Sequence, residues 1–202
     1  MTIVAVSNDE QWTDLTANPG DIKWVKAAAL SFDQYITADA FFILDEHTSL
    51  NYAATTKPVF INSVITTLQE LNVPANVLRI NGWHGFLQRC VWEVAGTIDD
   101  NCKTVIEKIG KKMIAVKDEP GLVAATIIAM IINEAYFAWG ENVSSKAAID
   151  TAMKLGTNYP YGPFEWADKI GIHNIFNLLQ QLSLSDQRYL PAPALINAIQ
   201  NK

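Results

Sequence analysis

Several features that would assign a function directly are missing from this 202-residue sequence. Lys and Arg number 15 against 21 Asp and Glu, a net charge of −6, and the basic residues form no stripe of the kind that binds nucleic acids or anionic membranes. The longest apolar stretch, residues 122–132, is shorter than the roughly 18 residues of a membrane-spanning helix. The first residues, 1–6, lack the basic and long apolar parts of a secretory signal. We expect a soluble, cytoplasmic protein that binds neither nucleic acid nor membranes.

The sequence is also poor in thiols and in metal-ligand patterns. Its two cysteines, Cys90 and Cys102, show no Cys-x-x-Cys spacing and no histidine at zinc-site spacing. Asp45, Glu46 and His47 are adjacent, but neighbouring polar residues in a loop are typically solvated and not metal-binding. We therefore expect two reduced thiols and no bound metal.

The first 118 residues alternate short strand-like runs with helical patterns. The runs hold four or five apolar or β-branched residues, as in strands that are buried on both faces of a parallel sheet. This alternation predicts an α/β sheet with crossover helices. Helices are expected over residues 9–17, 64–71 and 99–109, and strands over residues 3–6, 22–25, 40–44, 58–61, 77–80, 90–94 and 113–116.

The remaining residues show helical patterns only. Residues 122–139 are apolar on nearly every side, which is typical of a central or interface helix. The next helix is expected to end at Gly156, because glycine favours the left-handed conformation after a helix. Two domains are therefore predicted, an α/β domain over 1–118 and an all-helical domain over 119–202. Further helices are expected over residues 164–169 and 173–182 and, after Pro193, over residues 195–199.

Four stretches of this helical part resemble one enzyme family. Residues 118–123 (DEPGLV) and 133–135 (NEA) look like the start of the helical domain of 3-hydroxyacyl-CoA dehydrogenases. Residues 143–156 (VSSKAAIDTAMKLG) and 158–171 (NYPYGPFEWADKIG) continue the similarity in register, with glycines and prolines at the turns. The resemblance implies the helical domain of that family, which forms homodimers, and so we expect a homodimer through this domain.

The resemblance extends more faintly into the first half. Residues 38–46 (ADAFFILDE) look like a strand of the family's nucleotide-binding domain, and Asn62 falls at its Ser-Asn-Thr-Ser-Ser segment. Residues 94–97 with 108–117 look like the strand–helix–strand that closes that domain. The implied fold is a trimmed Rossmann-like parallel sheet followed by the helical domain.

The first half lacks the loop with which the family binds NAD. There, a G-x-G-x-x-G turn after the first strand lets the backbone approach the pyrophosphate at a helix N-terminus. Here the first glycine is Gly20, and the strand is followed by Ser7, Asn8, Asp9 and Glu10. The two carboxylates would repel a diphosphate, and Ser7 or Asn8 is expected to be a plain helix cap. The acidic ribose-binding residue and the helical insertion after the second strand are also missing. We expect no bound cofactor.

The resemblance leaves two assignments open for the catalytic pair. In the family a histidine takes the proton of the 3-hydroxyl group and a glutamate twelve residues later orients it. An ungapped alignment places Asn81 at the histidine position and Glu93 at the glutamate position, and an amide cannot act as a general base. A gapped alignment instead makes His84 the base, with Glu93 as its partner.

Other positions implied by the resemblance have lost polar groups. Ala125 replaces the asparagine that contacts the reacting carbonyl, and Val64 replaces a small hydroxyl residue. Asn62 remains as a candidate substrate-binding residue. An acyl-CoA pocket, if it persists, is expected to be bordered by Tyr159, Tyr161 and Phe164.

Three functional hypotheses follow. The first is a degenerate 3-hydroxyacyl-CoA dehydrogenase-like protein without normal NAD-dependent turnover, which acts as a binding or assembly partner in acyl-CoA metabolism. The second is an active NAD-dependent 3-hydroxyacyl-CoA dehydrogenase that uses His84 and Glu93. The third is a protein in which only the acyl-CoA pocket persists. Binding of NADH distinguishes the second hypothesis from the others.

Overall fold

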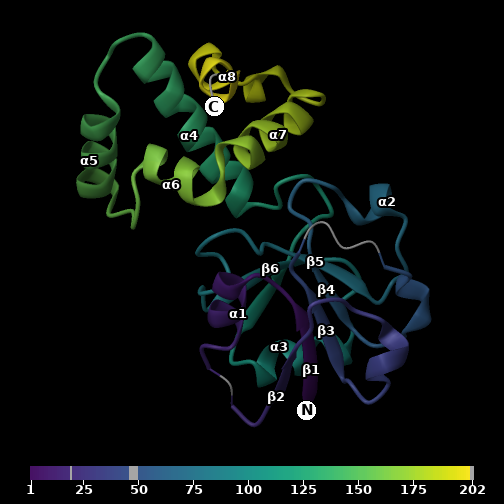
Figure 1. The fold of residues 1–202 in the computed structure, drawn as a ribbon. Helices are drawn as coiled ribbons and strands as arrows, with labels where there is room; N and C mark the ends of the chain where they lie inside the picture. The colour runs from purple at the N-terminus through teal and green to yellow at the C-terminus, as the bar shows by residue number, and fades with distance from the viewer. Residues whose placement is uncertain (19, 46–49, 201–202) are drawn as a thin grey trace. The chain divides into compact units, whose positions relative to one another are not determined.

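The computed structural model describes residues 1–18, 20–45 and 50–200. The chain divides into two compact units, residues 1–122 and 123–202 (Figure 1). The sequence predicts this division near residue 118. The first unit contains every strand of the described residues and the second contains only helices. The predicted fold class, an α/β sheet followed by a helical domain, is confirmed.

The first unit is built on a seven-stranded sheet in the order β2-β1-β3-β4-β5-β6-β7. All neighbouring strands are parallel except β5 and β6, which are antiparallel. This exception corrects the expectation of a wholly parallel sheet. Residues 81–90 join these two strands by turns without a helix, and so short a connection cannot make a parallel crossover. The strands are β1 (Thr2–Val6), β2 (Lys23–Lys26), β3 (Ala40–Ile43), β4 (Val59–Asn62), β5 (Val77–Ile80), β6 (Val91–Ala95) and β7 (Lys112–Ala115).

Both faces of the central strands are covered. Side chains alternate along a strand, so Phe42 and Phe60 point into the core under α1 (Asp9–Leu15) and α3 (Asp100–Lys108). Phe41 and Ile61 point into a second core, which is closed by the short helix η1 (Phe32–Tyr35) and its flanking segments. This double burial explains why β3, β4 and β5 are buried at all four positions and read as continuous apolar runs.

The helix expected over residues 64–71 is much shorter than predicted. Only α2 (Leu68–Leu71) is helical, and its N-cap is Thr67, which forms a capping box with Glu70. The residues before it wrap around the guanidinium of Arg79 instead. Its Nε donates to the Ser63 carbonyl at 2.6 Å and its Nη2 to the Val64 carbonyl at 2.9 Å. These carbonyls accept hydrogen bonds from Arg79, which is distant in sequence, in place of the amides of a first helical turn.

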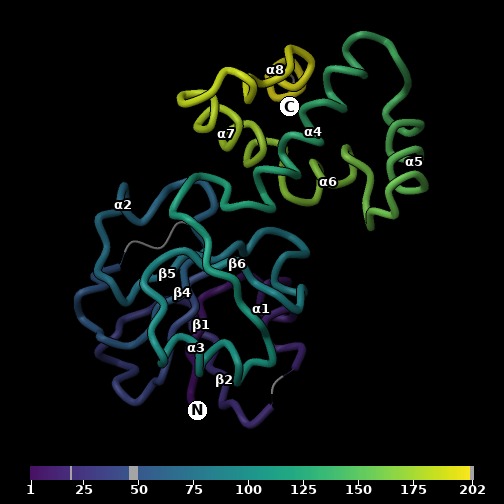
Figure 2. Tube along the Cα trace, turned by 180° about the vertical axis from the view of Figure 1, so that it is seen from behind, coloured from purple at the N-terminus to yellow at the C-terminus, as the bar shows by residue number. Residues whose placement is uncertain are grey.

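The second unit is arranged around α4 (Ala124–Gly140). In both views, α5 (Lys146–Thr157) lies on one side of α4, whereas α7 (Ile172–Ser183) and α8 (Pro193–Gln200) lie on the other (Figures 1 and 2). Between α5 and α7 the chain forms α6 (Pro163–Ile170), and the short helix η3 (Gln187–Tyr189) precedes α8.

The predicted end of α5 is wrong by one residue. The helix continues through Gly156, and Asn158 adopts the left-handed conformation at φ 56° that closes it. Asparagine tolerates this conformation better than other residues with a side chain. Within the described part of the chain, no helix is both long and apolar enough to cross a membrane.

Candidate functional site

The sheet topology defines where a ligand of the first unit is expected. Strand β1 pairs with β2 on one side and with β3 on the other, so the chain reverses its direction across the sheet between these two connections. Ligands of open α/β sheets bind at such a switch point, beyond the carboxyl ends of the strands. The residues that follow β1, β3, β4 and β5 therefore form the candidate site.

The turn after β1 is a helix cap formed by side chains. Asn8 is the N-cap of α1: its Oδ1 accepts from the Gln11 amide at 2.8 Å, and Gln11 Oε1 accepts from the Asn8 amide at 3.2 Å. The expected capping role of Asn8 is confirmed. Asp9 and Glu10 follow in the first turn. The ammonium of Lys26, 2.5 Å from Asp9, lowers the pKa of this carboxyl. The helix dipole is thus complemented by the chain's own carboxylates.

Gln11 also takes part in a closed ring of hydrogen bonds with Leu44, Asn62 and Gly82, called here the amide ring. Gln11 Nε2 donates to the carbonyls of Leu44 and Gly82, both at 3.1 Å. Asn62 Nδ2 donates to the same Leu44 carbonyl at 3.2 Å, and Asn62 Oδ1 accepts from the Gly82 amide at 2.9 Å. The amide ring thus joins the start of α1 to the ends of β3, β4 and β5.

Gly82 is required for this arrangement. A Cβ atom at this position would lie 2.7 Å from Cγ of Asn62. This distance is too short for two carbon atoms, so Asn62 would have to move. Asn62 itself is only 6% exposed. The predicted substrate-binding residue Asn62 is therefore at the candidate site, but both its amide nitrogen and its amide oxygen bond within the protein.

The three residues proposed for catalysis lie in different surroundings. His84 follows β5, and its Nδ1 contacts the Glu10 carboxylate at the start of α1. Asn81 is buried, and its Oδ1 accepts from the Trp83 amide at 3.1 Å. Glu93 lies on β6 between two residues of the core under α1 and α3, so its side chain points to the opposite face of the sheet. Glu10, which sequence reasoning missed, is thus a carboxylate partner of His84.

The aromatic residues predicted to border an acyl-CoA pocket form two clusters in the second unit. Tyr159 and Tyr161 pack against Trp166, with ring centroids 5.4 and 6.1 Å apart. Phe164 is buried, and its ring lies 4.9 Å from that of Tyr136 on α4. Phe164 therefore contributes to the packing of α6 against α4, whereas the two tyrosines belong to the loop before α6.

A lysine completes the cluster around Phe164. The ammonium of Lys146, at the start of α5, lies 4.1 Å from the ring centroid of Trp139 and 5.3 and 5.1 Å from those of Tyr136 and Phe164. A cation at a helix N-terminus opposes the helix dipole. The three rings compensate for this, because their faces attract the cation.

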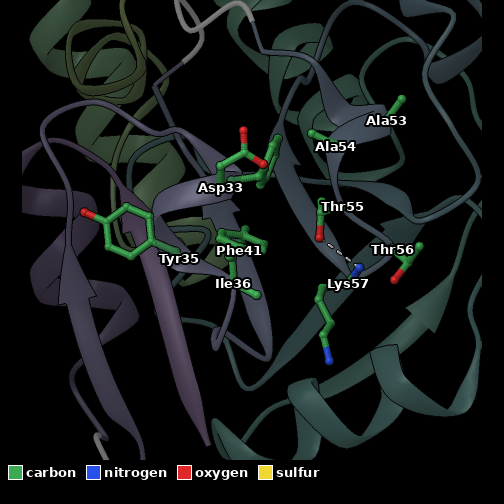
Figure 3. Close-up of a pocket in the computed structure, with 10 residues that line it drawn as sticks. Asp33, Tyr35, Ile36, Phe41, Ala53, Ala54, Thr55, Thr56 and Lys57 are labelled. Atoms are coloured by element: carbon green, nitrogen blue, oxygen red, sulfur yellow. Dashed lines mark hydrogen bonds between the residues drawn. The ribbon is translucent and has the colours of Figure 1, made fainter.

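A separate hollow of about 300 Å³ lies near the amino ends of β3 and β4 (Figure 3). Phe32 and Phe41 line it from the core side. Asp33 and Lys57 also line it, but Figure 3 shows the two charged groups pointing away from each other. Because these charges do not converge on one place, we do not assign the functional site to this hollow.

Among residues 1–18, 20–45 and 50–200, no group of three His, Cys, Asp or Glu residues is arranged to hold a metal ion. Glu46 and His47 lie outside the described residues.

Comparison with known proteins gives its strongest match in the second unit. Residues 121–202 match the family described as 3-hydroxyacyl-CoA dehydrogenase, C-terminal domain. The chain is 41% identical over 92 residues to the 3-hydroxyadipyl-CoA dehydrogenase of Escherichia coli strain K12, covering 45% of this chain and 19% of that protein. It is 29% identical over 180 residues to the 3-hydroxybutyryl-CoA dehydrogenase of Clostridioides difficile, covering 83% of this chain and 62% of that protein. The chain thus spans less than two thirds of each relative.

Solved structures show the same fold. The crystal structure of (S)-3-hydroxybutyryl-CoA dehydrogenase from Ralstonia eutropha superposes with a TM-score of 0.74 at 19% identity, covering 99% of this chain and 93% of that chain. The crystal structure of 3-hydroxybutyryl-CoA dehydrogenase from E. coli K12 gives a TM-score of 0.59 at 32% identity, covering 70% of this chain and 31% of that chain.

Proposed function

We propose that this chain, whose residues 121–202 match the C-terminal domain of 3-hydroxyacyl-CoA dehydrogenases, is a degenerate member of that family without normal NAD-dependent turnover. In this proposal it acts as a binding or assembly partner in acyl-CoA metabolism. The observation that carries the proposal is the turn between β1 and α1. Asn8 and Gln11 cap the helix there with their side chains, where backbone would have to approach a pyrophosphate directly.

Charge at the same turn supports the proposal. Asp9 and Glu10 place two carboxylates in the first turn of α1, and like charges would oppose the entry of a diphosphate. The first glycine of the chain, Gly20, lies beyond α1. The residues present therefore do not fit NAD held in the Rossmann manner, and we derive no hydride transfer for this chain.

The positions that the family uses for catalysis support the same conclusion. If the ungapped alignment holds, Asn81 stands at the histidine position, and its amide has no usable proton affinity. Val64 and Ala125, which replace polar residues of the family, are both buried. A protein that lacks the base and these two polar groups is better suited to bind a ligand than to transform it.

The partner in this proposal is first of all a second copy of the chain. Ile127 of α4 is 53% exposed, and Val143, just after this helix, is 70% exposed. Burying apolar surface of this kind favours association. Light scattering is expected to give twice the chain mass of 22.4 kDa. A mass of one chain at micromolar concentration would exclude the homodimer.

The central test is a titration with NADH. A purified active family dehydrogenase should show saturable binding by fluorescence or calorimetry, whereas this protein should show none at micromolar NADH. Thermal stabilisation by acetoacetyl-CoA, measured in parallel, tests whether the acyl-CoA pocket persists. Saturable NADH binding would contradict the proposal, whatever the result with acetoacetyl-CoA.

One observation favours the second candidate, an active dehydrogenase that uses His84. The contact between His84 Nδ1 and Glu10 gives this histidine a carboxylate that can orient it as a general base. This candidate predicts that NADH forms from NAD and 3-hydroxybutyryl-CoA, and that His84→Gln abolishes this formation. Wild-type protein that forms no NADH under conditions in which a family enzyme does would exclude it.

A further inference from the structure

The amide ring lies across the place where a ligand of this sheet would bind. Gln11 extends from the first turn of α1 to Leu44, beyond β3, and to Gly82, beyond β5. In the strand order of the sheet, the two carbonyls that it bonds follow strands on either side of β4. The carboxyl ends of these strands form the crevice of the switch point.

The polar groups of the amide ring form their hydrogen bonds with one another. Both hydrogens of Gln11 Nε2 are donated, the Leu44 carbonyl accepts from two side-chain amides, and Gly82 uses both its N–H and its C=O. Backbone groups at strand ends normally remain available to loops, water or ligands. In this ring they are already bonded within the protein.

We propose that the amide ring closes the switch-point crevice from inside. The place where a cofactor would bind then holds hydrogen bonds that fasten α1 to the ends of β3, β4 and β5. We call this connection the joint. This inference rests on the proposed function, and it adds a positioning role for Gln11 and Asn62. Restoring glycines to the turn after β1 would therefore not restore dinucleotide binding while Gln11 remains. The joint also holds the backbone of Gly82 through its N–H and C=O groups. It thereby positions the neighbouring residues Asn81 and His84.

The decisive variant is Gln11→Glu. It keeps the length of the side chain and the oxygen that accepts from the Asn8 amide, and glutamate suits the third position of a helix. It removes both donations of Gln11 Nε2 and places a carboxylate against two carbonyls. The capping box alone predicts equal or higher stability, whereas the joint predicts that Tm falls by about 4–8 °C, the effect of two lost hydrogen bonds.

The control is Gln34→Glu, the same change at an exposed residue of η1, which should shift Tm by less than about 1 °C. Asn62→Asp keeps the acceptor for the Gly82 amide but loses the donation to the Leu44 carbonyl, and so should also lower Tm. Because Gln11 and Asn62 share this carbonyl, the double variant should lose less than the sum of the single losses. Additive losses would overturn the ring as a cooperative unit.

Hydrogen exchange provides a readout that does not depend on global unfolding. The Gly82 amide should be protected in the wild type and should exchange faster in Gln11→Glu, even where the variant is fully folded. Unchanged exchange together with unchanged Tm would overturn the proposal.

The closure of the crevice has a separate test. The variant Ser7→Gly/Asp9→Gly should remain without saturable NADH binding while Gln11 is intact, and binding by this variant would overturn the closure. NADH binding by the wild type would instead refute the proposed function. Tm and exchange would then still decide whether the joint exists.

Discussion

The ion pair of Arg79 and Asp118 allows the sharpest stability prediction, the effect of Asp118→Ala. The side chain of Arg79 is 0% exposed, and its Nη1 lies 2.5 Å from Asp118 Oδ1. Asp118 also accepts from the amides of Leu68 and Gln69, at 3.1 and 3.2 Å. The substitution removes a charge partner from a buried cation and a carboxylate from the start of α2.

The expected cost follows from this geometry. Removing one partner of a buried ion pair costs roughly 3–5 kcal/mol, because the remaining charge stays buried without compensation. The Asp118 side chain is 27% exposed, so that water can partly replace it, and the lower end of this range applies. We expect a loss of about 3 kcal/mol, which corresponds to a Tm lowered by about 6–12 °C.

The same pair predicts how stability depends on pH. Burial opposes the charge of Asp118, but hydrogen bonds from Arg79, Leu68 and Gln69 outweigh it and lower the pKa of this carboxyl below its ordinary 3.8. The folded state therefore binds fewer protons than the unfolded state in this window. The contribution is fully present above pH 3.8 and is lost as the pH falls through the folded pKa. In Asp118→Ala this part of the pH dependence should disappear.

Urea unfolding followed by tryptophan fluorescence at neutral pH measures the loss, and a double-mutant cycle tests its origin. Arg79→Met should also be costly, because Asp118 and three backbone carbonyls lose the hydrogen bonds that Arg79 donates to them. The variant Arg79→Met/Asp118→Ala should lose clearly less than the sum, because no buried charge remains. A loss below about 1 kcal/mol for Asp118→Ala, or additivity within about 0.5 kcal/mol, would refute the reasoning.

Three other predictions concern single side chains. Asn133→Ala should destabilise the helical unit by about 2–3 kcal/mol in urea, because the buried amide bonds both the carbonyl and the amide of the segment 190–192. Lys146→Met should lower the free energy of unfolding by about 1–2 kcal/mol, because it removes the cation–π contacts of the Lys146 ammonium with three aromatic rings. Lys146→Arg keeps a cation at this position and should retain most of this stability. A thiol reagent at pH 8 should label one cysteine per folded chain, since Cys90 is exposed and burial raises the pKa of Cys102 to about 12.

The fold was largely predictable because its signals are local. Apolar runs of four or five residues marked the seven strands of the described sheet to within one residue at each end. The antiparallel pair of β5 and β6 could also have been foreseen, since the segment 81–90 is too short for a crossover helix. The length of α2 could not, because its missing first turns depend on the contacts of Ser63 and Val64 with Arg79, which is distant in sequence.

The candidate site was predictable only in part. The missing glycines and the cap at Asn8 could be read directly, and Gln11 three residues later is the local signature of a capping box. The second role of Gln11 could not be read, because Leu44 and Gly82 become its neighbours only when β3 and β5 enter the same sheet. The contact of Glu10 with His84 likewise depends on this long-range pairing.

The strength of the resemblance in the helical unit has a physical reason. A Cβ at Gly162 would lie 2.3 Å from Oδ1 of Asp150, and one at Gly140 would lie 2.9 Å from Cβ of Ala194. These constraints come from helix packing and persist whether or not a ligand binds. A glycine turn after β1 is required only by the pyrophosphate. Once that requirement is lifted, residues that cap a helix, such as Asn8, stabilise the turn better. Loss of cofactor binding would thus change the sheet unit first and leave the match over residues 121–202 intact.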